Sequence, residues 1–380
     1  MLYGRNSLSF VALLLATGAS AQADPSITSV SVFANGAAVG GTGPDSITIG
    51  DGSVWVEYAN VGVSTGGGAS EIVRYSPFGA VQDTYSIAGL VDGLKVNPVT
   101  GMVWALQNND GNATLSFINP TTNLVSNPLV YASPPYVYGS TSSRGYDDVA
   151  FLGGRVYLSY TNPVNPTDSV LQILNNGNKP SGTLTTTSIL TAKQTGIAMP
   201  DIDSLKSTPN GKLVLTSEGD GSGTGNPVAE FTLISHPGAK NQTQVTVPVT
   251  NAKGQDAEAM DDVLFPDATA GTLYISDTGS DTVYALNLTG LDPNTPIISL
   301  GSFGEVALVN PVTGVVEDAL FTGLTSPHGL DFVPAGASKP ELVTAGAPEP
   351  STWAMLLIGF ASLGYAGYRS SARQKSALAS

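Results

Sequence analysis

Apolar runs alternate with polar turns along most of the chain, in a unit that recurs. Each unit opens with an acidic residue or a histidine, followed by an apolar strand, a turn, a second strand, a polar loop and a third strand. Self-similarity at about 40 to 55 residues is typical of β-propellers, in which one unit forms one blade. The six openings are Asp45-Ser46-Ile47, Asp92-Gly93-Leu94, Asp147-Asp148-Val149, Asp203-Ser204-Leu205, Glu258-Ala259-Met260 and His328-Gly329-Leu330.

The later strands of each unit follow turns that contain proline or glycine, which favour tight hairpins. Second strands are expected at 54–56, 102–106, 156–158, 213–215 and 273–275, and third strands at 72–75, 115–118, 170–174, 230–234 and 283–287. The sixth unit has room for only two strands, 329–333 and 341–343. A strand at 27–33 has no unit of its own, so we expect it to pair into the last blade and cover its open edge.

The pattern therefore predicts an all-β chain that folds as a six-bladed β-propeller over residues 24–345. Seven blades are the alternative, if 297–300, 305–309 and 315–320 form a degenerate blade of their own. The stretch from Tyr274 to Tyr284 (YISDTGSDTVY) resembles the strand-loop-strand signature of NHL-type and gluconolactonase-type propellers. The resemblance covers one repeat and implies the architecture, not a particular chemistry.

The N-terminus has the pattern of a secretory signal peptide over residues 1–23. Arg5 precedes an apolar run at 8–16, and small residues then stand at Ala19-Ser20-Ala21 and Ala21-Gln22-Ala23, as a signal peptidase requires. The sequence therefore predicts export.

The C-terminus has three parts: Pro348-Glu349-Pro350, an apolar stretch at 351–368, and a basic tail with Arg369, Arg373 and Lys375. The apolar stretch predicts a transmembrane helix, slightly short of the ~20 residues that a bilayer asks for, with the tail on the cytoplasmic side. Residues 347–375 resemble the PEP-CTERM sorting signal of Gram-negative bacteria. This resemblance implies export through the inner membrane, cleavage near the Pro-Glu-Pro motif by an exosortase-type enzyme, and release or attachment at the cell surface, commonly with exopolysaccharide and biofilm. An ordinary single-span anchor is the alternative.

Amino-acid composition disfavours some classes of binding partner and excludes some classes of active site. Lys and Arg number 15 against 30 Asp and Glu, a net charge of -15, which disfavours nucleic acid as a partner. Cysteine is absent, so disulfides, zinc-thiolate sites and thiol nucleophiles are excluded. There are 44 glycines and 25 prolines, which agrees with frequent turns rather than long helices.

The unit openings also supply the candidate site. First strands of a propeller line its axis, so Asp45, Asp92, Asp147, Asp203, Glu258 and His328 are expected to encircle one mouth of the channel. Crowded carboxylates raise one another's pKa values unless a cation neutralises them, and oxygen ligands with one imidazole favour Ca²⁺, Mg²⁺ or Mn²⁺. The alternative is that these acids cap strand ends by binding backbone amides.

Two functions agree with these observations. The first is an exported propeller that presents an acidic face to cations, exopolysaccharide or matrix proteins without catalysis. The second is a metal-dependent hydrolase of the lactonase or esterase kind, in which a cation polarises a carbonyl and His328 or a free carboxylate moves the proton.

Overall fold

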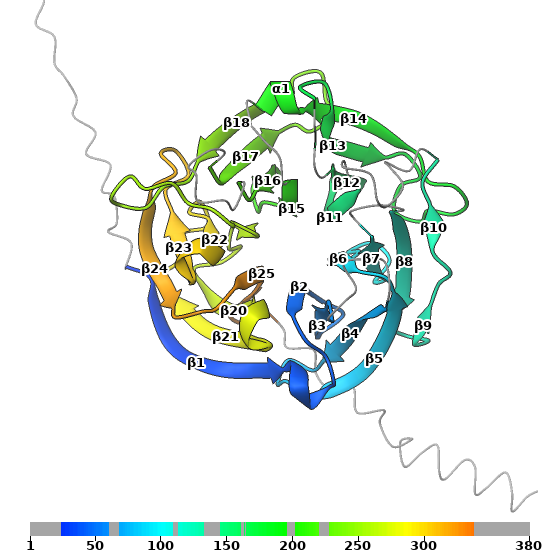
Figure 1. Ribbon diagram of the computed structural model, residues 1–380, viewed down its shortest axis with the longest axis horizontal. Helices are drawn as coiled ribbons and strands as arrows, with labels where there is room; N and C mark the ends of the chain where they lie inside the picture. The colour runs from blue at the N-terminus through cyan, green and yellow to red at the C-terminus, as the bar shows by residue number, and fades with distance from the viewer. Residues whose placement is uncertain are drawn as a thin grey trace, which may run out of the picture. The chain divides into compact units, whose positions relative to one another are not determined.

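The structure, a computed structural model, describes residues 24–60, 68–108, 113–132, 145–160, 163, 165–195, 202–219 and 228–337. These residues form six antiparallel sheets arranged radially around one axis (Figure 1). Each sheet is one blade with four or five strands, and the first strand lies nearest the axis. The prediction of an all-β, six-bladed propeller is confirmed.

The strands are given blade by blade, from the axis outward. Blade 1 contains β2 (Pro44–Gly50), β3 (Ser53–Tyr58), β4 (Ala69–Tyr75) and β5 (Val81–Ala88). Blade 2 contains β6 (Val91–Val96), β7 (Val103–Gln107), β8 (Thr114–Asn119), β9 (Leu124–Val125) and β10 (Leu129–Val130). Blade 3 contains β11 (Tyr146–Leu152), β12 (Arg155–Tyr160), β13 (Ser169–Leu174) and β14 (Thr186–Thr191), and blade 4 contains β15 (Ile202–Ser207), β16 (Leu213–Ser217), β17 (Glu230–Ser235) and β18 (Thr243–Pro248).

The last two blades are interleaved in the sequence. Blade 5 contains β19 (Val263–Leu264), β22 (Ile297–Leu300), β23 (Glu305–Val309) and β24 (Val316–Thr322). Blade 6 contains β25 (Pro327–Pro334), β20 (Ala270–Asp277), β21 (Thr282–Thr289) and β1 (Ser26–Asn35). The described helices are all short: α1 (Ala192–Thr195) and the 3₁₀ turns η1 (Gly36–Ala38), η3 (Thr278–Ser280) and η4 (Gly301–Phe303).

This interleaving corrects two strand assignments. The expected strands at 273–275 and 283–287 lie in blade 6, not blade 5, and the segments 297–300, 305–309 and 315–320 form the outer strands of blade 5 rather than a seventh blade. Strand length supplies the reason. β19 has two residues, whereas β25 has eight, so the eight-residue β20 forms a much longer ladder with β25.

The N-terminal strand closes the ring, as predicted. β1 is the outermost strand of blade 6 and pairs antiparallel with β21, from Ser26 opposite Thr289 to Asn35 opposite Thr282. The Phe33 ring of β1 packs edge-on against Tyr274 of blade 6 and Tyr75 of blade 1. The distances between ring centroids are 4.9 Å and 5.6 Å respectively. Phe33 therefore joins the last blade to the first.

The first strands of five blades carry a β-bulge at the same place. In blade 1, Asp45 and Ser46 together face Glu57, because Pro44 pairs with Tyr58 and Ile47 with Val56. The same two-to-one count recurs at Asp92, Asp147, Asp203 and His328. A bulge adds one residue to a strand and re-aims its side chains, so each opening residue is turned toward the axis.

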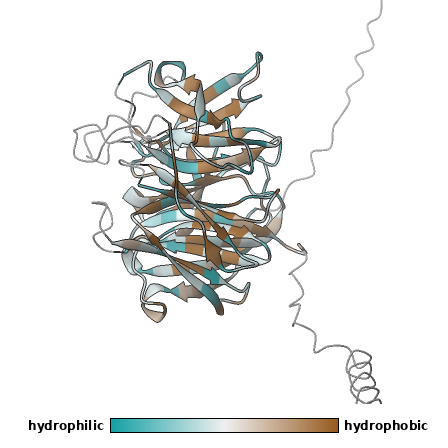
Figure 2. Cartoon of the chain, turned by 90° about the vertical axis from the view of Figure 1, so that its right-hand side faces the viewer, coloured by the Kyte–Doolittle hydropathy of each residue, from teal (hydrophilic) through white to brown (hydrophobic). Residues whose placement is uncertain are grey.

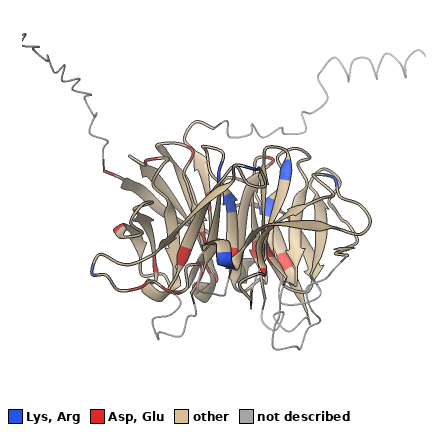
Figure 3. Cartoon of the chain, turned by 90° about the horizontal axis from the view of Figure 1, so that it is seen from above, with Lys and Arg blue, Asp and Glu red and all other residues tan. Residues whose placement is uncertain are grey.

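The blades are held together by apolar side chains between neighbouring sheets. Each of the hydrophobic clusters draws on the facing strands of one or two blades, with Trp55 and Trp104 among the largest fully buried side chains. In the side view of Figure 2 the apolar segments lie within the strands. Charged positions take up a small part of the ribbon in Figure 3, which matches their 12% share of the sequence.

Several sequence predictions fall outside the described residues: the signal peptide at 1–23, the strand at 341–343, the Pro348-Glu349-Pro350 motif, the apolar stretch at 351–368 and the basic residues Arg369 and Arg373. Among the residues that are described, no helix is both long and apolar enough to span a membrane.

The closing strand yields a test of stability. Phe33→Ala should lower the free energy of unfolding by about 2 kcal/mol, because it removes a partly buried ring that packs on two blades. Val32→Ala on the same strand, where the side chain is 60% exposed, should change it by less than about 0.5 kcal/mol. Urea unfolding of both variants measures these changes. Equal losses of unfolding free energy in the two variants would contradict the role of Phe33 in closing the ring.

Candidate functional site

Six side chains from six blades meet at one end of the channel. Asp45, Asp92, Asp147, Asp203 and Asp261 line a common cavity, and His328 contacts two of these aspartates. We call these six residues the acid ring. Each precedes or opens the first strand of its blade, and in five of the blades the bulge described above aims it at the axis.

The structure confirms the convergence of Asp45, Asp92, Asp147, Asp203 and His328 but corrects the position from blade 5. Glu258 does not line the cavity; Asp261, three residues later, occupies the equivalent place. The reason is local. Glu258 lies in an irregular segment where its N–H bonds to Ser302 Oγ at 3.2 Å, and Asp261 lies two residues before the start of β19. The tripeptide Asp261-Asp262-Val263 repeats the form of Asp147-Asp148-Val149, so the sequence did contain the signal.

Two groups within the site have ligand atoms close enough to share one ion. In the first, oxygens of Asp203, Glu218 and Asp261 lie within 4.8 Å of one another. In the second, Asp45 and Asp261 flank His328, whose Nδ1 lies 3.2 Å from Asp45 Oδ1 and 2.7 Å from Asp261 Oδ1. Asp261 belongs to both groups and is the centre of the site.

The electrostatics of the ring are those of crowded, buried carboxylates. Burial, and then the charges of neighbouring acids, raises the pKa of Asp92 and of Asp203 well above the ordinary value. Burial also raises the pKa of Asp261, although His328 opposes the shift. Burial alone lowers the pKa of His328, but Asp261 and Asp45 outweigh it, so this pKa lies well above its usual value. The imidazolium is then the ring's internal cation.

Glu57 is a further carboxyl beside the ring that the sequence did not reveal. It faces the bulge at Asp45 and Ser46, its side chain is fully buried, and neither carboxyl oxygen has a hydrogen-bond partner among the described residues. Burial, and then the charge of Asp45, raises the pKa of Glu57 well above the ordinary value. Asp203 Oδ2 is likewise buried without a hydrogen-bond partner.

In four other blades, the position equivalent to Glu57 carries a hydroxyl. Ser159, Thr216 and Ser299 accept the N–H of the residue after the ring position, at 2.7 to 2.9 Å, and Ser276 donates to the Gly329 carbonyl at 3.3 Å. These hydroxyls satisfy backbone groups that the irregular strand leaves free. Glu57 departs from this pattern, which makes its buried carboxyl the more notable.

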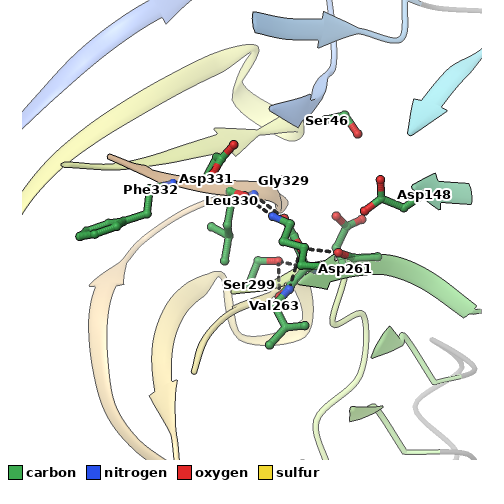
Figure 4. Close-up of polar contacts among 12 residues, drawn as sticks. Ser46, Asp148, Asp261, Val263, Ser299, Gly329, Leu330, Asp331 and Phe332 are labelled. Carbon is green, nitrogen blue, oxygen red and sulfur yellow. Dashed lines mark hydrogen bonds and ion pairs between the residues drawn. The ribbon is translucent and has the colours of Figure 1, made fainter. Parts of the chain in front are cut away.

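A second set of acids, just beyond the ring, has a different role. Asp148, Asp262 and Asp331 each accept the N–H of their own successor through one oxygen and an N–H from another blade through the other. The second donors are Leu205 at 3.0 Å, Leu330 at 2.6 Å and Ile49 at 2.9 Å respectively. Lys206 Nζ also bonds to Asp262 Oδ2 and to the Leu330 carbonyl. Figure 4 labels Asp148, Leu330 and Asp331 of this set. These bracing aspartates do what the sequence alternative assigned to the ring.

The ring cavity is small in the part of the chain that the structure describes. It leaves about 20 Å³ for the centre of a water-sized sphere, and one water molecule needs roughly 10 to 15 Å³ on that measure. An ion or a water molecule fits, whereas an organic ring does not.

Comparison with known proteins finds similarity to solved structures at low sequence identity. No protein-family model matches the chain, and no curated protein matches it. Similar solved structures include a protein from Bacteroides caccae (10% identity, TM-score 0.47, 77% of this chain and 87% of the other) and the periplasmic gluconolactonase PpgL of Pseudomonas aeruginosa (12%, 0.46, 76% and 88%). The hydrazine synthase of Kuenenia stuttgartiensis is also similar (8%, 0.45, 77% and 84%).

The buried carboxyl of Glu57 yields a test by pH. Its pKa is raised in the folded state, so folding keeps a proton that the unfolded chain loses above about pH 4.3, and stability falls as pH rises from there. Glu57→Gln should therefore raise the free energy of unfolding of the metal-free protein at pH 7 by about 1 kcal/mol or more, and the gain should vanish near pH 4.

Urea unfolding at pH 4, 5.5 and 7 measures this effect. Glu71→Gln on β4, where the side chain is only partly buried, is the control and should leave the pH profile of the parent unchanged. A Glu57→Gln gain that is the same at all three pH values would show that the carboxyl is ionised in the folded protein.

Proposed function

We propose that this protein is an exported propeller that binds a divalent cation at the acid ring. The convergence of Asp203, Glu218 and Asp261 within 4.8 Å carries the proposal. Three carboxylates at that spacing repel one another in a buried site, and a cation between them converts the repulsion into attraction.

A comparison with the bracing aspartates supports cation binding at the acid ring. Asp148, Asp262 and Asp331 are stabilised by two backbone N–H groups each, and Lys206 adds a charge at Asp262. Within the described part of the chain, one buried oxygen of Asp203 and both carboxyl oxygens of Glu57 have no hydrogen-bond partner. Because an unpaired buried polar atom is costly, these oxygens favour a ligand that supplies positive charge.

The donor set favours a hard ion. Carboxylate oxygens suit Ca²⁺, Mg²⁺ and Mn²⁺, and Ca²⁺ tolerates an irregular set of six to eight oxygens, some from water. Asp203, Glu218 and Asp261 would hold the ion. His328, which bonds to Asp45 and Asp261, would orient the shared carboxylate of Asp261.

Size of the cavity favours binding over catalysis. The ring has room for an ion but none for a lactone or ester beside it in the described structure. We therefore place the protein among binding or matrix modules, with exopolysaccharide or matrix proteins as partners at the cell surface. The hydrolase of lactonase or esterase type, with His328 as the proton carrier, is the second candidate. The convergence of acids on one point is the observation that supports this second candidate.

Loss of a shared ligand gives the first test of cation binding. Asp261→Asn should weaken Ca²⁺ or Mn²⁺ binding by about 100-fold or more, because even outer-shell partners of a metal cost about 10- to 100-fold. Isothermal titration calorimetry of the chelator-treated protein with Ca²⁺, Mn²⁺ and Mg²⁺ measures the loss. At 100 times its dissociation constant, the ion should also stabilise the parent protein by about 2.7 kcal/mol.

Glu258→Gln is the matched control, because Glu258 is an acid three residues away that does not line the cavity. Its affinity for the ion should equal that of the parent. Absence of heat and of any Tm shift with all three ions would remove the cation from the proposed function. Hydrolysis of a lactone or ester panel that stops on chelation would favour the second candidate.

Export carries its own test, independent of the ring. In a Gram-negative host that has an exosortase-type enzyme, the mature chain should begin near residue 22 or 24 and end near Pro348. Intact-mass spectrometry of envelope and culture fractions locates both ends. Glu349→Gln should leave the first cleavage intact and block the second, whereas a mature chain that retains Arg369 and Arg373 would indicate an ordinary anchor.

A further inference from the structure

The channel holds a second polar layer, three residues beyond the acid ring in each first strand. The six residues at this level are Thr48, Lys95, Ala150, Lys206, Leu264 and Asp331. Thr48, Lys95, Ala150, Lys206 and Asp331 line a separate cavity of about 200 Å³, which we call the lower cavity. It is far roomier than the ring cavity, and it extends toward the ends of the first strands away from the ring.

Among the charged groups of the lower cavity, the one that remains available to a ligand is a hydrogen-bond donor. Both oxygens of Asp331 accept backbone N–H groups, from Phe332 at 2.8 Å and from Ile49 at 2.9 Å. Lys206 is bonded to Asp262 and Leu330. The Lys95 ammonium group, by contrast, makes no hydrogen bond or close ion pair with any residue that the structure describes, and interacts with carboxylates only at longer range.

Lys95 is nevertheless charged. Burial lowers its pKa, but the carboxylates of Asp148, Asp331 and Asp262 outweigh that effect and raise the pKa overall. These three carboxylates lie beyond the ring, which places the ammonium group at the level of the second layer. This ammonium group offers three hydrogen-bond donors to whatever fills the cavity, whether water or a ligand.

Half of the residues that line the lower cavity are apolar. Ile49, Val96 and Phe151 line it and are partly buried against three different hydrophobic clusters. Binding sites for small molecules commonly combine such walls with one or two polar groups that fix the ligand's orientation.

We propose that the lower cavity binds a small organic carboxylate, whose carboxylate group pairs with Lys95 and Lys206 while its apolar body packs on Ile49, Val96 and Phe151. The site shares none of the carboxylates of the proposed cation site, although Lys95 and Lys206 line both cavities. Benzoate binding measured with chelator and again with Ca²⁺ therefore tests the two proposals separately.

Benzoate is the probe, with benzyl alcohol as the uncharged analogue and acetate as the carboxylate without an apolar body. Isothermal titration calorimetry on the purified chain, with chelator and again with Ca²⁺, should give binding of benzoate in both conditions and weaker or no binding of the other two. Lys95→Met should weaken benzoate binding by about tenfold or more, the usual effect of losing a charged hydrogen bond.

Two further variants keep the test decisive. Lys95→Arg retains the charge and should bind benzoate within about threefold of the parent, which separates loss of the site from loss of the fold. Lys253→Met removes an exposed lysine outside the cavity and should bind like the parent. Benzoate affinity that is unmeasurable in the millimolar range, equal to that of benzyl alcohol, or unchanged in Lys95→Met would overturn the proposal.

Discussion

Repulsion between like charges at the hub is the constraint on which the functional part of this structure depends. Six first strands converge on one axis, and a bulge at the same place in five of them turns the opening residue inward. The propeller therefore gathers carboxylates of successive blades that are 47 to 58 positions apart in the sequence. Apolar packing between the blades supplies the free energy that holds them there, since no carboxylate cluster would assemble by itself.

The negative charge of the channel carboxylates is compensated in different ways at its successive levels. At the ring, His328 provides one internal cation between Asp45 and Asp261, and buried oxygens of Asp203 and Glu57 have no partner among the residues that the structure describes. At the next level, Asp148 and Asp262 accept N–H groups from neighbouring blades, so the same residue type becomes a structural brace. Blades 3 and 5 thus each place a ring aspartate and a bracing aspartate side by side, as Asp147-Asp148 and Asp261-Asp262. Adjacency in sequence says little about which one carries function.

The sequence predicted the blade number, the closing strand and five of the six ring positions because each depends on a local, repeated pattern. It did not predict that β20 and β21 would leave blade 5, since a hairpin with alternating apolar residues fits any first strand of sufficient length. The spacing of the repeats predicted Glu258, whereas the Asp-Asp-Val tripeptide that begins at Asp261 indicated the correct ring position. Glu57 could not have been found, because its importance arises from burial opposite a bulge rather than from any motif.

Lysine placement shows why the two ends of the channel differ in chemistry. The chain has only 15 basic residues, yet two lysines occupy the second layer of the hub, where burial makes each of them costly. Lys206 is explained by its bonds to Asp262 and Leu330, which join blades 4, 5 and 6. Lys95 has no such bond with a described residue, and it stabilises the carboxylates of Asp148 and Asp331 through its charge alone. Its ammonium group also lines the lower cavity, where the proposed carboxylate ligand would contact it.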